Sequence, residues 1–130
     1  MIDTISDMLI RIKNASAVKK NTVSLPYSKI KMEIALILER EGYIGKAEHK
    51  GKKAKKIIEI PLIYDEDKNS AVNYVKRVSK PSRRVYVSAK NIEKRAKNKG
   101  LFIISTPKGL LTGSEAKKAN LGGEILFYIF

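Results

Sequence analysis

The chain ends in an unbroken run of six apolar residues, Ile125–Phe130. Neighbouring residues of a strand point to opposite faces of a sheet, so a strand made of this run is apolar on both faces. Such a strand belongs in the middle of a covered sheet. The sequence therefore predicts a central strand over Glu124–Phe130 and a chain that ends inside its own core.

The preceding residues predict further short strands, which are Val72–Val78, Arg84–Val87 and Leu101–Ser105. Clusters of Pro, Gly and Lys separate these segments, a pattern typical of a compact β-rich fold. Two short helices are expected between the strands. One lies near Asn91–Asn98, and the other begins at Thr112, forms a capping box with Glu115 and ends before Gly122.

The beginning of the chain has the pattern of an amphipathic helix over Thr4–Ala17. Four apolar residues recur there at the i, i+3, i+4, i+7 spacing of one helical face, namely Ile5, Met8, Leu9 and Ile12. A second helix is expected over Lys29–Glu41, with Ser28 as its N-cap and Gly42 as its stop.

Strands are expected on either side of the second helix. Thr22–Leu25 precedes it, and Tyr43–Glu48 and Ile57–Tyr64 follow it as a hairpin. The loop of this hairpin is rich in lysine, at Lys50, Lys52, Lys53, Lys55 and Lys56. These lysines are either a solvated loop or ligands of a phosphate backbone, which add affinity without sequence choice.

A polar stretch without apolar residues, Asp65–Ser70, divides these two parts of the sequence and is the best candidate linker. The expected fold is α+β with two small lobes. Residues 1–65 form an N-terminal α/β lobe with the order helix, strand, helix, hairpin. Residues 66–130 form a C-terminal β-rich antiparallel lobe with short helices.

The charge of the chain limits its partners. With 27 Lys and Arg against 13 Asp and Glu, the net charge is +14, and this excess repels itself unless a polyanion neutralises it. A nucleic acid is the first partner to consider, and a general packaging protein remains an alternative. An acidic membrane is disfavoured because neither an 18-residue apolar run nor a long basic amphipathic helix occurs.

The residue types argue against catalysis, and no cofactor or metal is expected. The sequence has no Cys, one His and no G-x-G-x-x-G or Walker pattern. His49 lies in a Lys-rich stretch and is interpreted as solvated surface. A nuclease or RNA-modifying enzyme would need preorganised carboxylates, whereas the acidic cluster Asp65–Asp67 lies in the expected linker.

The segment Ser105-Thr106-Pro107-Lys108-Gly109 follows an expected strand and turns at Pro107 and Gly109. Its hydroxyls can both donate and accept, which suits base edges, phosphates and the 2′-OH of RNA. Taken alone, however, such a turn is ordinary loop structure.

Several motifs occur in the order found in a known family, and they are Ile5–Asn14, Pro26–Lys31, Glu41–Ile44, Arg77–Pro81, Arg84–Tyr86, Ser105–Gly109 and Thr112–Phe130 with its Gly122-Gly123-Glu124. Together they resemble the eighth protein of the small ribosomal subunit, the S-eight family, in its bacterial form. The likeness extends over essentially the whole chain.

The resemblance implies a non-enzymatic constituent of the small ribosomal subunit. It implies binding to a helix in the central domain of small-subunit ribosomal RNA early in assembly, beside neighbouring small-subunit proteins. Some family members also repress their own messenger RNA. The expected location is the ribosome in the cytoplasm, since Met1–Thr4 begins no leader peptide.

The resemblance also implies the RNA-binding residues. In the C-terminal lobe these are Ser105, Thr106, Lys108, Gly109, Tyr86, Gly122, Gly123 and Glu124. In the N-terminal lobe they are Asp3, Arg11, Asn14, Ser28, Lys29, Lys31 and Lys56, mainly toward the sugar-phosphate backbone. Tyr86 either stacks on a base or sugar or packs beneath the turn.

Overall fold

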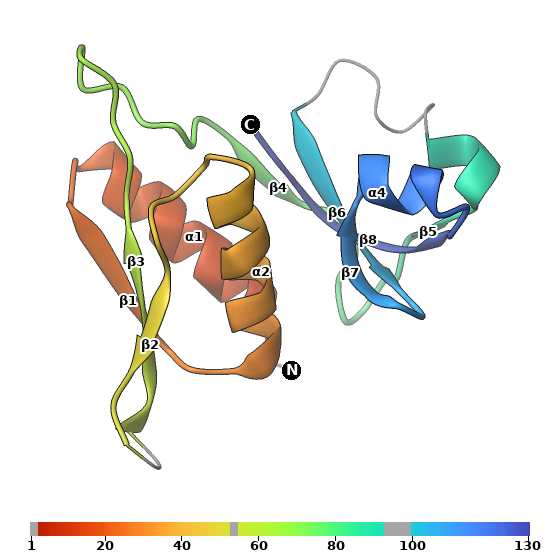
Figure 1. Cartoon of the computed structure of the whole chain (residues 1–130), viewed down its shortest axis with the longest axis horizontal. Helices are drawn as coiled ribbons and strands as arrows, with labels where there is room; N and C mark the ends of the chain where they lie inside the picture. The colour runs from red at the N-terminus through yellow and green to blue at the C-terminus, as the bar shows by residue number, and fades with distance from the viewer. Residues whose placement is uncertain (1–2, 53–54, 93–99) are drawn as a thin grey trace. The chain divides into compact units, whose positions relative to one another are not determined.

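The computed structural model describes residues 3–52, 55–92 and 100–130, which form two compact units (Figure 1). The first unit is Thr4–Asn73, and the second combines Asp3 with Tyr74–Phe130. The mixed α+β architecture expected from the sequence is confirmed. No helix among the described residues is long and apolar enough to cross a membrane.

The two helices of the first unit form where the apolar spacing predicts them. Helix α1 spans Thr4–Ala17 and helix α2 spans Lys29–Arg40, one residue shorter than expected. The apolar stripes of both helices are buried, and Met8, Ile12, Ile34 and Leu38 are fully covered. Burying side chains of this size is worth about 1.5 to 3 kcal/mol each, which is the main force holding the helices to their sheet.

The sheet of the first unit has the antiparallel order β1-β3-β2. Its strands are β1 (Thr22–Pro26), β2 (Glu48–Lys50) and β3 (Ile57–Pro61). Both helices lie on the same side of these strands (Figure 1). The side chains that face them are buried, at Val23, Leu25, Ile58 and Ile60.

The predicted hairpin is present, but its strands are shorter than expected. Beyond β2 and β3 only an isolated bridge joins Ile44 to Leu62. Pro61 has no backbone N–H to donate at this point, and its ring lies so close to Gly45 that a Cβ there would be 2.9 Å from the proline Cβ. The regular ladder therefore stops at Pro61.

The segment predicted as a linker is an ordered turn within the first unit. One side-chain oxygen of Asp65, Oδ1, accepts hydrogen bonds from the backbone N–H groups of Asp67 at 2.9 Å and Asn69 at 2.8 Å. This Asx-type turn accounts for the polar composition. The two compact units divide between Asn73 and Tyr74. The predicted division into lobes that end at residue 65 and begin at residue 66 stays a prediction.

The second unit contains a five-stranded antiparallel sheet with the order β4-β8-β6-β7 and β5 paired to β8. The strands are β4 (Val75–Arg77), β5 (Tyr86–Val87), β6 (Leu101–Thr106), β7 (Gly109–Thr112) and β8 (Gly123–Ile129). The expected central position of the last strand is confirmed, because β8 pairs with β4, β5 and β6. The chain does not end inside its core as predicted, since Phe130 lies beyond β8 and is 38% exposed. Strand β7 was not predicted, since it is the short return arm of the turn.

Short helices cover this sheet. Helix α4 (Gly113–Lys118) begins at Thr112 with the predicted capping box, in which Glu115 N donates to Thr112 Oγ1 at 3.1 Å. A short 3-10 turn, η2, spans Ala89–Asn91. The remainder of the helix predicted near Asn91–Asn98 lies outside the described residues. The core beneath these elements contains Phe102, Ile104, Ala116 and Ile125.

Candidate nucleic-acid interface

The Ser-Thr turn is the hairpin between β6 and β7. Thr106 pairs with Gly109, which leaves Pro107 and Lys108 as the two loop residues. Pro107 has the fixed φ that a turn of this kind favours at its first loop position. Gly109 has φ 104°, in the left-handed region that favours glycine. The turn therefore projects Pro107, Lys108 and Gly109 into solvent, where all three are exposed.

The Thr106 hydroxyl is used inside the turn. It donates to the carbonyl oxygen of Gly109 at 2.8 Å and accepts from the backbone N–H of Lys108 at 3.1 Å. Thr106 is also only 9% exposed. The single proton of its hydroxyl is already donated to Gly109 O. This side chain therefore stabilises the turn and can only accept a hydrogen bond from a ligand.

Ser105 belongs to a row of residues that crosses four strands. Tyr86 of β5 lies opposite Glu124 of β8, Glu124 lies opposite Ser105 of β6, and Ser105 lies opposite Leu110 of β7. Residues directly opposite in a sheet point to the same face. Ser105, Glu124 and Tyr86, which are far apart in the sequence, therefore share one face.

At the row, this face of the sheet is open to solvent, whereas Ile103, two residues before Ser105 on the same face, is fully buried. The neighbours of the row along β6 and β8, Ile104 and Ile125, are fully buried. Ser105, Glu124 and Tyr86 alternate with them and are half-buried or exposed. Tyr86 is 67% exposed, so its ring is not packed beneath the turn and is available for stacking.

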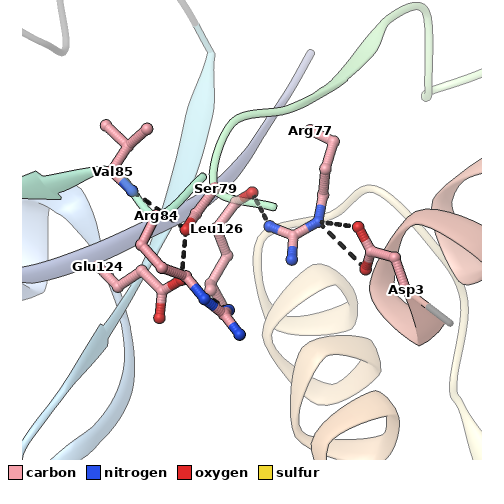
Figure 2. A network of polar contacts seen from close by, with 7 residues as sticks. All are labelled: Asp3, Arg77, Ser79, Arg84, Val85, Glu124 and Leu126. Atoms are coloured by element: carbon pink, nitrogen blue, oxygen red, sulfur yellow. Dashed lines mark hydrogen bonds and ion pairs between the residues drawn. The ribbon is translucent and has the colours of Figure 1, made fainter. Parts of the chain in front are cut away.

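The Glu124 carboxylate is engaged within the second unit (Figure 2). Its Oε2 accepts a hydrogen bond from the Ser79 hydroxyl and another from Arg84 Nη1 at 3.0 Å. Ser79 is fully buried, and its hydroxyl also accepts from Val85 N–H at 3.2 Å. Glu124 thus ties the segment leading into β5 to the centre of the sheet.

Gly122 and Gly123 permit a close approach of backbones. A Cβ at Gly122 would lie 2.4 Å from the carbonyl oxygen of Val87, and a Cβ at Gly123 would lie 2.1 Å from that of Ser105. Side-chain carbons do not tolerate such distances. The lack of a side chain at these two glycines therefore lets the start of β8 lie close to the backbones of Val87 and Ser105.

Asp3 also has an internal partner. Arg77 Nε lies 3.1 Å from Asp3 Oδ2, with the side chains only 9% and 20% exposed, and the guanidinium donates to the carbonyl oxygen of Leu126 as well (Figure 2). A carboxylate would repel phosphate in any case. Asp3 therefore pairs with Arg77 within the second unit, and its contact with RNA stays a prediction.

The predicted ligands on α1 lie at a surface hollow of the first unit. Arg11 and Asn14 line this hollow of about 410 Å³ together with Lys20, Thr22 and Ser24. Arg11 Nε forms an exposed i,i+4 ion pair with Asp7 at 3.2 Å. Exposed pairs are weak, so Arg11 can exchange this partner for a phosphate at small cost.

The remaining predicted ligands surround the start of α2. The Ser28 hydroxyl is the N-cap and accepts from Lys31 N–H at 3.3 Å. Lys29 and Lys56 are exposed, whereas Lys31 is only 6% exposed. Lys56 Nζ lies over the ring of Tyr27, 5.9 Å from its centroid. Tyr27 was not singled out from the sequence, because its proximity to Lys56 arises only when β1 and β3 pair.

We expect Ser28→Ala to lower the free energy of unfolding by about 1 kcal/mol, because the hydroxyl caps α2. Ser28→Asp keeps a capping oxygen and should retain the stability, but it places a negative charge beside Lys29 and should weaken RNA binding at low salt. Urea denaturation and RNA titration of both variants check this. Unchanged stability of Ser28→Ala would contradict the capping role.

The basic tip of the β2–β3 hairpin contains Lys50, Lys52, Lys55 and Lys56, all exposed, while Lys53 lies outside the described residues. The Glu59 carboxylate 3.1 Å from Lys50 raises the pKa of that ammonium group. In the acidic turn Asp65–Asp67, the Asp65 carboxylate accepts a hydrogen bond from the backbone N–H of Asp67. Among the described residues, no group of three or more side chains could hold a metal ion.

Comparison with known proteins gives consistent matches along the chain. The family model of Ribosomal protein S8 matches residues 3–130. The chain is 45% identical over 130 residues to small ribosomal subunit protein uS8 of Vesicomyosocius okutanii, covering 100% of this chain and 98% of that protein. Proteins of the same name from Mycoplasmopsis pulmonis and Enterococcus faecalis are 46% and 41% identical, covering 98% and 100% of this chain and 96% and 98% of theirs.

Proposed function

Because the chain belongs to the ribosomal protein S8 family, a structural and non-enzymatic family of the small ribosomal subunit, we propose that it binds small-subunit ribosomal RNA through the part of its five-stranded sheet where Tyr86, Glu124 and Ser105 reach solvent. The target is a folded helix of the central domain. Binding there holds the RNA for neighbouring small-subunit proteins during assembly.

The row formed by Tyr86, Glu124 and Ser105 carries this proposal. It places an exposed aromatic ring and a half-buried hydroxyl on one face, at the base of an exposed turn. The hydroxyl can donate to or accept from a base edge or a 2′-OH, and the ring can stack on an unpaired base or a sugar. Such a face reads the shape of a distorted helix, and not only its charge.

The internal contacts divide the predicted residues by role. Ser105, Tyr86, Lys108 and the backbone of Gly109 are proposed to touch RNA. Thr106, Gly122, Gly123 and Glu124 are proposed to position them, since their polar groups or close contacts are used within the unit. Exposed cations before β5, at Lys80, Arg83 and Arg84, are proposed as additional phosphate ligands.

The first unit is proposed to contact the sugar-phosphate backbone through its exposed Arg11, Asn14, Lys29 and Lys56, whereas the predicted ligand Lys31 is largely buried. These contacts add affinity and salt dependence, whereas the row supplies the choice of site. Repression of the protein's own messenger RNA follows if that message contains a mimic of the ribosomal helix.

We expect Ser105→Ala to lose most of the preference for a central-domain RNA fragment over a scrambled duplex while keeping its stability. A lost hydrogen bond to RNA costs about 1 kcal/mol, and a partner left unpaired costs about 1 to 3 kcal/mol, so affinity should fall roughly 5- to 100-fold. The scrambled duplex should bind as before, because the basic residues are unchanged.

Thr106→Val is the matched variant, since it removes the neighbouring hydroxyl at nearly constant volume. Its principal effect should be on stability, with a loss of about 1 to 3 kcal/mol, because Gly109 O and Lys108 N lose their shared partner. Filter binding of both variants measures the loss of RNA contact, and urea denaturation measures the loss of stability. Equal loss of RNA preference in stable Thr106→Val and Ser105→Ala would overturn the division of roles.

A general packaging function would show a different pattern. The net charge of +14 allows binding to any polyanion. In that case neither variant changes the ratio of the two RNA affinities, and salt weakens both complexes equally.

A further inference from the structure

We propose that Tyr27, His49 and Lys56 form a second RNA site on the first unit, a stacking platform for one unpaired nucleobase with a lysine for the adjoining phosphate. This inference deepens the proposed function and rests on it. It gives a role to His49, which the sequence interpretation treated as solvated surface, and to Tyr27, which it did not single out, beside Lys56, which it assigned to the sugar-phosphate backbone. We call these three residues the Tyr27 platform.

Two aromatic rings meet on the platform. The centroids of Tyr27 and His49 are 5.2 Å apart, and the ring planes are tilted by 43°. This separation lies in the range favoured by aromatic pairs. Tyr27 is 37% exposed, and His49 is also exposed. The pair therefore presents aromatic surface to solvent.

The register of the sheet explains why these residues meet. His49 of β2 lies opposite Ile58 of β3, which lies opposite Leu25 of β1. Tyr27 comes two residues after Leu25, and Lys56 comes two residues before Ile58. The two are joined by a hydrogen bond in which Tyr27 N–H donates to Lys56 O at 3.0 Å. Residues two apart on a strand share a face. All five side chains thus lie on the face that α1 and α2 cover farther along the strands.

The same alternation separates the platform from the nearby acidic side chains. Glu48 and Glu59 lie opposite each other, one residue away from His49 and Ile58, and so point to the other face. Glu59 is paired there with Lys50 at 3.1 Å. The platform face carries a cation, Lys56, and exposed Lys29 follows Tyr27 by two residues. Its local charge therefore favours an anionic ligand.

An unpaired nucleotide fits this combination. Its base has a flat face that stacks on aromatic rings, and its phosphate is a ligand for lysine. Lys56 is exposed, and its Nζ lies 5.9 Å from the Tyr27 centroid, near the outer limit of a cation–π contact. The ammonium can therefore leave the ring for a phosphate at small cost. An acidic peptide would use the lysines but would gain nothing from the exposed rings.

The test uses His49 as a reporter, because it is the only histidine of the chain and its imidazole proton signals are unique. The full chain is titrated with hexa-adenylate, followed by proton NMR. The proposal predicts a saturable upfield shift of the His49 signals, caused by the ring current of the stacked base. Tyr27→Ala should weaken this binding roughly 5- to 100-fold, whereas Tyr27→Phe should retain it.

Lys56→Ala and Lys46→Ala form a matched pair of lysine variants in the same unit. Lys46 is exposed and lies outside the platform. Only Lys56→Ala should weaken hexa-adenylate binding beyond the general effect of one lost charge. Equal weakening by the two variants would overturn the assignment of Lys56.

Two results would overturn the platform itself, namely unmoved His49 signals at saturating hexa-adenylate and an equal response to hexaglutamate. Ser105→Ala should leave the His49 shift unchanged, because Ser105 belongs to the second unit. Failure of the platform therefore shows in the His49 signals, whereas failure of the proposed function shows in the preference for the ribosomal fragment.

Discussion

Gly123→Ala is expected to unfold the second unit or to lower its free energy of unfolding by about 3 kcal/mol or more. The added Cβ would lie 2.1 Å from the carbonyl oxygen of Ser105 and 3.0 Å from the Ile104 side chain. The closest atom belongs to backbone in a neighbouring strand of the same sheet, so neither strand can move without losing ladder hydrogen bonds. RNA binding through the Ser105 row should be lost together with the fold.

Thermal unfolding followed by circular dichroism measures this effect, and a fall in Tm of roughly 10 °C or more is expected. Gly42→Ala is the control, since Gly42 has φ +84° but no atom within 4 Å of its added Cβ. That substitution should cost only the strain of the left-handed backbone, about 1 to 2 kcal/mol. Similar losses for the two variants would contradict the close-approach role of Gly123.

Glu124→Ala is expected to weaken both stability and RNA binding, although it removes a negative charge from a protein that binds a polyanion. Ser79 is fully buried, and its hydroxyl would lose the carboxylate that accepts its proton. Hydrogen bonds to a charged group contribute about 1.5 to 3 kcal/mol, so the free energy of unfolding should fall by about 2 to 3 kcal/mol. Arg84 and Val85 would lose their support, and the segment leading to Tyr86 would be less well positioned.

The sign of the change in RNA affinity separates two roles of Glu124. If the carboxylate positions the RNA-binding face, affinity for the central-domain fragment should fall about tenfold, because ordering that face must then occur on binding. If the carboxylate merely repels phosphate, affinity should rise. Glu59→Ala removes the same charge from an exposed pair with Lys50 and should change stability by at most about 1 kcal/mol.

Much of the fold could be predicted because local signals and tertiary packing agree. The apolar stripe of Thr4–Ala17, the Ser28 cap and the Thr112 capping box each define an element that the structure contains. Strand lengths were less predictable. The first hairpin is shorter because Pro61 ends the ladder, and β7 was missed because four residues after a turn carry too little pattern.

The candidate site was less accessible to sequence reasoning, because it depends on strand register. The composition indicates a polyanion ligand, and the turn residues indicate hydroxyl chemistry. Only the register shows that Tyr86, Glu124 and Ser105 form one row. The internal partners of Thr106, Glu124 and Asp3 likewise follow from tertiary contacts, and so does the meeting of Tyr27 with His49.

The most direct test of RNA reading by the sheet face compares the binding of the unmodified protein to a central-domain fragment of small-subunit ribosomal RNA and to a scrambled duplex of equal length. Both titrations are carried out over a series of salt concentrations. Specific reading predicts tighter binding to the ribosomal fragment at every concentration, with a preference that survives when salt weakens both complexes. Equal affinities, falling together with salt, would contradict specific recognition and leave only a basic protein that binds polyanions.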